Sequence, residues 1–271
     1  MDLLELYKNR RQAFSYKLDA HIEEETILEC FKKAQIESPS KNNEQPYKVN
    51  IFGPDCQNIK ERIYKKVIDK HRRMQQKSID RNLSATKLKP HDTINQLSDD
   101  QRLGNINVNY RHVLDNTYLA VFSQRLTNPN QYNLNLAATG GHYLDNADPL
   151  ELKNNEKAVA VEVGLFADAV SLFLLERGIG SSYHICFQPD ADNFIDIPGV
   201  TDYIKDGPCE GQLVGTVFLM MSIGIVNLTK RQYLEKLEKD KSKIFYNDSD
   251  HYNSNTKPSF ETVVKIHKKI I

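Results

Sequence analysis

Four groups of residues along the chain carry side chains that suit a phosphorylated heterocycle. They are the basic pair Arg10 and Arg11, the polar loop 38–47, the glycine-rich helix end 178–180, and the late pair Lys241 and Lys243. Guanidinium and ammonium groups bind phosphate through charged hydrogen bonds, while amides and backbone N–H groups match the edges of a ring. These residue types therefore favour the binding of a phosphorylated cofactor.

The sequence contains none of the common short motifs of enzyme active sites. No GxGxxG follows a strand pattern, and the chain has no P-loop, HExxH or GxSxG motif. His142 beside two glycines, the loop acids Asp190 and Asp192, and Cys186 in an apolar strand each have an ordinary structural interpretation. We therefore expect no catalytic side chain and no metal site.

A run of positive charge leaves a second interpretation open. Residues 60–89 hold eleven Lys or Arg residues against three acids, a density that could bind nucleic acid or phosphate. Tyr64 is the single Phe, Tyr or Trp in this run, so the segment has no series of aromatic residues on which bases could stack. We favour a solvated helix face and expect no nucleic-acid partner.

The composition favours a cytoplasmic protein. Of 271 residues, 39% are apolar, and 36 acids balance 36 bases, so net charge gives no reason to expect a polyanionic partner. Residues 1–12 mix charges with leucines, unlike a signal peptide. The longest apolar run, 213–226, spans about 14 residues, fewer than the roughly 20 that cross a bilayer. The four cysteines are scattered, which favours reduced thiols. We expect no membrane partner.

Hydrophobic periodicity predicts helices interspersed with short strands. The predicted helices cover 1–9, 23–36, 58–82, 158–177 and 230–243, and the predicted strands cover 47–52, 117–122, 182–187 and 214–223. The stretches 84–107 and 127–154 lack periodicity and are predicted to be mostly irregular. Helix 158–177 is apolar nearly all round, so it should be central and buried.

This order of elements predicts one α+β domain over residues 1–271. The stretch at about 55–105 has too few apolar residues for a core of its own, so we interpret it as an insertion. A C-terminal tail begins at about residue 247.

Taken in order, the polar segments resemble those of the FMN-dependent nitroreductase family. Residues 10–16, Arg-Arg-Gln-Ala-Phe-Ser-Tyr, are similar to the family's opening Arg-Arg/His-Ser-x-Arg/Lys-x-Phe run. Residues 38–47, Ser-Pro-Ser-Lys-Asn-Asn-Glu-Gln-Pro-Tyr, resemble its Ser-Pro-Ser-x-x-Asn-x-Gln-Pro-Trp loop. Residues 109–115 and the helix from Glu162 to Gly180 resemble its later elements. The resemblance covers most of the chain outside the insertion.

The resemblance implies a nitroreductase-like α+β fold, with a mostly antiparallel central sheet flanked by helices and a homodimer formed through the long central helix. It implies an oxidoreductase with FMN at the dimer interface, NAD(P)H as hydride donor, and ping-pong transfer to an acceptor such as a nitroaromatic or quinone. By position, the cofactor-binding residues would be Arg10, Arg11, Gln12, Pro39, Ser40, Asn43, Asn109, His112, Ile185, Cys186, Lys241 and Lys243.

The resemblance also divides these residues by role. Arg10, Lys241 and Lys243 would hold the phosphate, and the loop residues Pro39, Ser40 and Asn43 would come from the other subunit. Asn109 and His112 would lie at the ring edge. The backbone of Ile185 and Cys186 would approach flavin N5.

Two departures from the family pattern favour an alternative function. Gln12 stands where a phosphate-binding Ser is usual, and Phe14 stands where a second cation is expected. Losing one charged hydrogen bond to phosphate would weaken FMN binding by about one to two orders of magnitude. The alternative is a degenerate nitroreductase-like dimer without redox turnover, acting as a flavin-binding or scaffolding protein.

Overall fold

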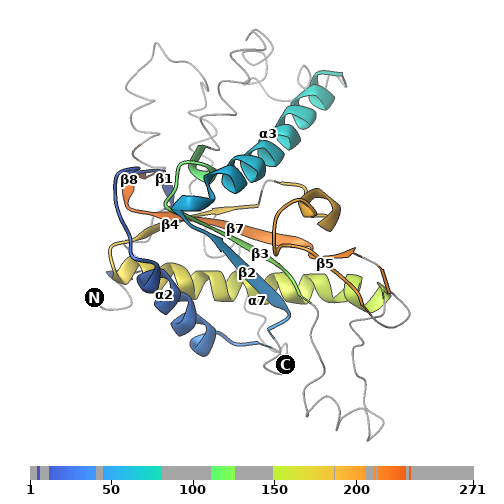
Figure 1. The fold of residues 1–271 in the computed structure, drawn as a ribbon, viewed down its shortest axis with the longest axis horizontal. Helices are drawn as coiled ribbons and strands as arrows, with labels where there is room; N and C mark the ends of the chain where they lie inside the picture. Colours follow the sequence, from blue (N-terminus) through green and yellow to red (C-terminus); the bar gives the residue numbers. More distant parts are fainter. Residues whose placement is uncertain are drawn as a thin grey trace, which may run out of the picture.

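The centre of the fold is a four-stranded sheet in the order β2-β3-β7-β4, with every neighbouring pair antiparallel (Figure 1). The computed structural model describes residues 5–6, 12–40, 45–80, 111–125, 149–185, 187–205, 210–211, 213–229 and 232. The four strands are β2 (Tyr47–Phe52), β3 (Tyr118–Gln124), β4 (Gly180–His184) and β7 (Val217–Gly224). The predicted mostly antiparallel sheet is confirmed.

Two short ribbons accompany this sheet. The strand β1 (Ala13–Tyr16) pairs with β8 (Val226–Thr229), and β5 (Asp202–Tyr203) pairs with β6 (Leu213–Val214). The Tyr16 hydroxyl donates a 2.8 Å hydrogen bond to the carbonyl of Ser222 on β7, which ties the first ribbon to the sheet.

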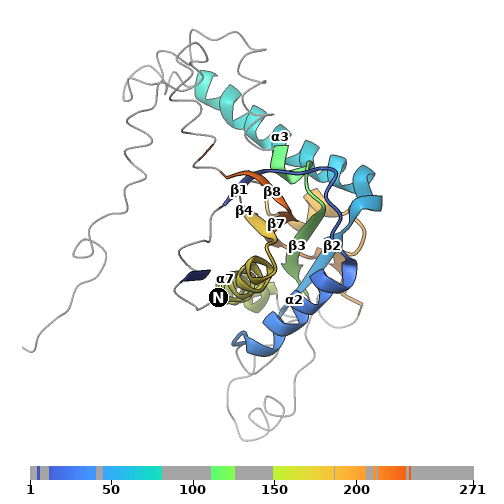
Figure 2. The ribbon, with the colours of Figure 1, turned by 90° about the vertical axis from the view of Figure 1, so that its left-hand side faces the viewer.

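Helices cover both faces of the sheet (Figure 2). Alternate residues of a strand point to opposite faces. Ala120 and Phe122 of β3 pack toward α2 (Glu24–Glu37) and α7 (Pro149–Glu176). Leu119 and Val121 join a second core with residues of α3 (Gln57–Asp80). Three 3₁₀ turns complete the described elements: η2 (Pro54–Cys56), η3 (Arg111–Val113) and η4 (Ala191–Phe194).

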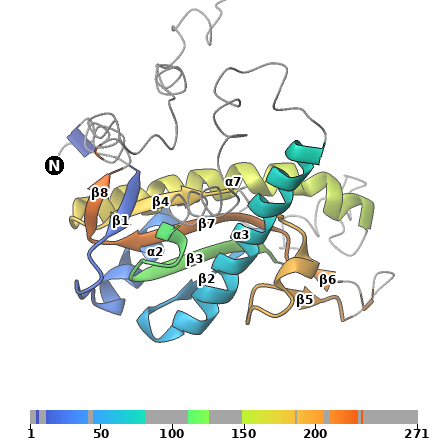
Figure 3. The ribbon, with the colours of Figure 1, turned by 90° about the horizontal axis from the view of Figure 1, so that it is seen from above.

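The helix α3 belongs to the stretch predicted as an insertion. It crosses over the sheet when the molecule is seen from above (Figure 3). Ile63 and Val67 are fully buried in the second core, so this part of the stretch contributes to the main body of the protein. The predicted domain organisation as a whole, including the C-terminal tail, lies partly outside the described residues and stays a prediction.

The helix α7 ends just before Gly178, as predicted. The Gly178 N–H donates to the carbonyl of Leu175, and the Ile179 N–H donates to the carbonyl of Leu174. Gly178 has φ +74°, which L residues with a side chain rarely adopt. This pair of bonds is a Schellman motif, and the buried Leu174 and Ile179 supply its usual apolar contact.

Several predicted boundaries are wrong for local reasons. The helix α7 begins at Pro149, inside a stretch predicted to be irregular, because proline suits the first turn of a helix. The predicted strand 214–223 is divided into β6 and β7, since Gly215 has φ +135°. The predicted strand 182–187 is β4, which pairs with β7 from Gly180 to His184 and ends there.

The helix α7 is central, but it is not buried on all sides. Among the described residues, its segment Ala158–Glu176 is the one helical stretch long and apolar enough to cross a membrane by length and composition. One face of α7 packs on α2 and the sheet through buried residues such as Val163, Phe166 and Val170. The other face is exposed, with Val161 at 64% and Leu165 at 48% of full exposure.

Candidate functional site

The structure brings Gln12 and Ile185 to the edge strand β4. Gln12 immediately precedes β1, and its Nε2 donates to Ser182 Oγ at 3.1 Å and to the carbonyl of Tyr183 at 3.4 Å. Ile185 directly follows β4, and its side chain is 68% exposed. Two predicted residues that are 173 positions apart in the sequence are therefore linked by the last residues of one strand.

His112, the third predicted residue in this region, contacts a histidine that the sequence analysis missed. His112 lies in η3 and is buried, with its ring centroid 5.8 Å from that of His184 in an edge-to-face arrangement. The His184 ring also lies 5.9 Å from the ring of Phe187, measured between centroids. The two buried imidazoles therefore form a polar pair inside the protein, beside the end of β4.

A side-chain pattern on β4 explains where His184 points. The Tyr183 hydroxyl donates to the carbonyl of Ala167 on α7 at 3.0 Å, so Tyr183 faces α7. Its neighbours Ser182 and His184 face the opposite side, which α3 covers, and both are buried. The polar alternation at 182–184 was visible in the sequence and could have indicated a polar strip on this face.

The turn η3 is anchored by a buried lysine of α3. Asn116 Nδ2 donates to the carbonyls of His112 and Val113, each at 2.9 Å. Lys60 Nζ in turn donates to the carbonyls of Asn116 at 3.0 Å and Thr117 at 2.9 Å. Lys60 is 1% exposed, and this burial lowers its pKa to about 8. Lys60 and Asn116 therefore fix the backbone that carries His112.

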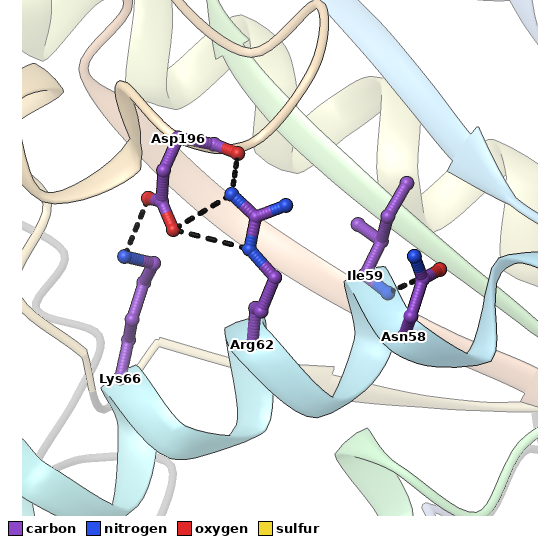
Figure 4. Close-up of polar contacts among 5 residues, drawn as sticks. All are labelled: Asn58, Ile59, Arg62, Lys66 and Asp196. Carbon is purple, nitrogen blue, oxygen red and sulfur yellow. Dashed lines mark hydrogen bonds and ion pairs between the residues drawn. The ribbon is translucent and has the colours of Figure 1, made fainter.

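The basic run around Lys60 is not uniformly a solvated face, which corrects the sequence-based interpretation. Arg62 and Lys66 of α3 both reach Asp196, just after η4 (Figure 4). Lys66 Nζ lies 2.6 Å from Asp196 Oδ1, and Arg62 bonds Oδ2 and the Asp196 carbonyl. Partial burial acts to raise the pKa of Asp196, but the bonds from Lys66 and Arg62 outweigh it, and the pKa lies below its ordinary value.

The predicted loop residues Pro39 and Ser40 lie on the opposite face of the sheet from His112. Ser40 Oγ donates to Glu162 Oε2 of α7 at 2.7 Å and accepts from the Gln45 N–H at 2.8 Å. Pro39 is exposed. The predicted site residues that the structure describes therefore fall into two groups on different faces of the sheet.

The remaining predicted residues lie outside the described residues. These are Arg10, Arg11, Asn43, Asn109, Cys186, Lys241 and Lys243. They include all the cations predicted to hold the phosphate. Within the described part of the chain, no group of three or more His, Cys, Asp or Glu residues is arranged to hold a metal ion.

Comparison with known proteins gives matches only in structure. No family model matches the chain, and no curated protein matches its sequence. A BluB-like flavoprotein from Clostridium difficile 630 is 16% identical, with a TM-score of 0.55 over 99% of this chain and 100% of that chain. This match spans the whole of both chains and establishes a common architecture.

Two further solved structures match with lower TM-scores. The FMN-dependent nitroreductase NfnB from Mycobacterium smegmatis, in complex with NADPH, is 17% identical over 83% of this chain and 90% of that chain, with a TM-score of 0.49. A nitroreductase family protein from Clostridium novyi NT is 13% identical over 84% and 86%, with a TM-score of 0.46. The chain has a nitroreductase-like α+β fold.

Proposed function

We propose that this chain is an FMN-dependent oxidoreductase that takes hydride from NAD(P)H and passes it to an acceptor such as a nitroaromatic or quinone. The observation that carries the proposal is the cluster of Gln12, His112 and Ile185 around β4, where the resemblance to nitroreductases places flavin contacts. The flavoprotein of similar architecture supports the same cofactor class. Fold alone does not specify chemistry, so the proposal depends on these residues.

The described residues fit the ring end of a flavin. The exposed Ile185 offers an apolar side chain and a strand-end backbone, and Gln12, at the position predicted near the phosphate, is tied to the same strand by its bonds to Ser182 and Tyr183. The buried imidazoles of His112 and His184 are polar groups beside the end of the same strand. When bound, FMN supplies hydride chemistry, and the protein contributes position and electrostatics. Arg10, Lys241 and Lys243 would hold the phosphate.

The proposed assembly is a homodimer across α7. Val161 and Leu165 expose apolar side chains on one face of this helix. Gly164 lies between them in the sequence. Apart from the adjoining turns of α7, no atom of the chain lies within 4 Å of the place where a Cβ would be at this position. A second copy could therefore approach the helix backbone closely, and the exposed apolar face would be covered.

An absorbance spectrum tests the proposed cofactor and its reduction. The protein is purified, mixed with FMN and freed of unbound flavin, and NADH or NADPH is added without oxygen. We expect a flavin band near one per subunit that one of the nicotinamides bleaches and a quinone or nitroaromatic restores. Arg10→Ala should lose the band, whereas the control Arg177→Ala, which removes a surface arginine paired with Glu29, should keep it.

One observation favours the alternative of a dimer without redox turnover. The Gln12 amide already donates to Ser182 and Tyr183, so it is not a spare phosphate ligand, and Phe14 in β1 carries no charge. Absence of a flavin band even after excess FMN, in a protein that sediments as a dimer, would refute the oxidoreductase and support the scaffolding role.

A further inference from the structure

The two ends of segment 41–44 are tied together and to α7 by one hydroxyl group. Ser40 Oγ accepts the Gln45 N–H at 2.8 Å and donates to Glu162 Oε2 at 2.7 Å. The same oxygen therefore joins Ser40 to Gln45 and attaches both residues to the long helix.

Further bonds hold Gln45 in an unusual conformation. Gln45 has φ +46°, the single positive φ outside glycine among the described residues. Its side chain exchanges hydrogen bonds with α2, accepting from Gln35 Nε2 at 2.8 Å and donating to the Gln35 carbonyl at 3.2 Å. Arg125 Nε donates to the Gln45 carbonyl at 2.8 Å. A left-handed residue costs free energy and persists only where its surroundings fix it.

Glu162 occupies an unusual place for an acid. It is 9% exposed on α7, while Val161 beside it and Leu165 one turn further expose apolar side chains. A buried carboxylate needs hydrogen bonds to offset the loss of water, and Ser40 supplies one. Burial, and to a lesser extent the nearby Glu162, raises the pKa of Tyr47 at the start of β2 to about 12.

We propose that Glu162 is a positioning residue that acts through Ser40 to hold Ser40 and Gln45 against α7. This inference rests on the proposed function, in which Pro39 and Ser40 line the flavin of the other subunit and α7 forms the dimer interface. Glu162 would then connect the helix that meets the second subunit to the residues that meet its cofactor. The role needs a hydrogen-bond acceptor at position 162, and it does not need a negative charge.

The test compares FMN dissociation constants, measured by quenching of flavin fluorescence, across matched variants. Glu162→Ala and Ser40→Ala should each weaken FMN by about tenfold, the size expected for one hydrogen bond to a charged group. The double variant should bind FMN no more weakly than Ser40→Ala alone, because Ser40→Ala already removes the bond that Glu162→Ala breaks. Glu162→Gln keeps an acceptor oxygen and should stay within about twofold of the original protein, as should the control Glu176→Ala on the exposed end of α7.

Backbone hydrogen exchange provides a readout that needs no flavin. The Gln45 N–H should exchange faster in Glu162→Ala and in Ser40→Ala than in Glu162→Gln, measured by mass spectrometry below the melting temperature. Additive losses of FMN affinity, or a Gln45 exchange rate unchanged in Glu162→Ala, would overturn the inference. If the original protein binds no FMN, the proposed function fails, and the exchange rates alone decide whether Glu162 fixes the loop. Ser40→Ala removes only a partly buried hydroxyl, so it keeps the test available if Glu162→Ala does not fold.

Discussion

Replacing Lys60 by Met should change how stability depends on pH. Lys60 is 1% exposed, and burial lowers its pKa from 10.5 to about 8. Between these two values the unfolded chain holds a proton that the folded protein has released. Stability increases with pH wherever the unfolded state binds more protons, so the original protein should gain stability as pH rises through this window. Lys60→Met removes the titrating group and this gain with it.

The size of the effect follows from the two pKa values. The difference, 10.5 minus about 8, is about 2.5, which corresponds to at most about 3 kcal/mol at 1.36 kcal/mol for each unit of pKa. At pH 7 the two proteins should be similar in stability. The variant avoids burying a charge, which stabilises it, but it also lacks the hydrogen bonds to the Asn116 and Thr117 carbonyls, which destabilises it. By pH 10 the original protein should have gained roughly 2–3 kcal/mol relative to Lys60→Met.

Urea unfolding at pH 7, 8, 9 and 10 measures this difference. Far-UV circular dichroism is the suitable signal, because the chain has no Trp. Lys65→Met is the matched control, since Lys65 is an exposed lysine of the same helix. Stability curves for Lys60→Met that run parallel to those of the original protein over the whole range would refute the reasoning. They would mean that Lys60 keeps its ordinary pKa and is hydrated in solution.

Three further substitutions test other parts of the structure. Asp196→Asn should cost up to about 1 kcal/mol at pH 7, because this 41% exposed side chain pairs with Arg62 and Lys66. The cost should vanish as pH falls through the lowered pKa of Asp196, and an unchanged cost at pH 2.5 in urea unfolding would contradict the ion pairs. Gly178→Ala should lower the free energy of unfolding by about 1–2 kcal/mol, because Ala rarely adopts a φ of +74°, and the added Cβ itself meets no atom within 4 Å. An unchanged stability in urea would show that the helix end rearranges. Val161→Glu should convert the proposed dimer to monomers in sedimentation, while the control Ile36→Glu on α2 should not; a Val161→Glu dimer would place the interface elsewhere.

The sequence predicted elements well where local periodicity and burial agree. The predicted helix 23–36 and strand 47–52 match α2 and β2 to within one residue, because each has a regular apolar pattern and a clear loop beside it. The ribbon of β1 and β8 was missed. Its strands are four residues long, and they are stabilised by pairing across more than 200 residues of chain, which no local pattern reports.

The candidate site likewise contains residues that the sequence predicted and residues that only long-range packing reveals. His112, Ile185 and Gln12 were predicted from their order along the chain, and the structure gathers them around β4. The roles of Lys60 and His184 could not be predicted in the same way. Lys60 is one of eleven cations in a run that looks solvated, and only the packing of α3 on the sheet shows that it is buried against η3. His184 becomes notable only through its contact with His112.

The separation of the described site residues bears on the proposed assembly. His112 and His184 face α3, while Ser40 is held by Glu162 of α7 on the other side of the sheet. A flat ring bound to one protomer cannot contact both groups through the sheet between them. If His112 and Ser40 both line a flavin, as the resemblance to nitroreductases implies, they must come from different protomers. The exposed apolar face of α7 around Val161 and Leu165 lies next to Glu162, which holds Ser40. The separation of His112 from Ser40 in one chain is therefore a second reason, beside this apolar face, to propose the homodimer across α7.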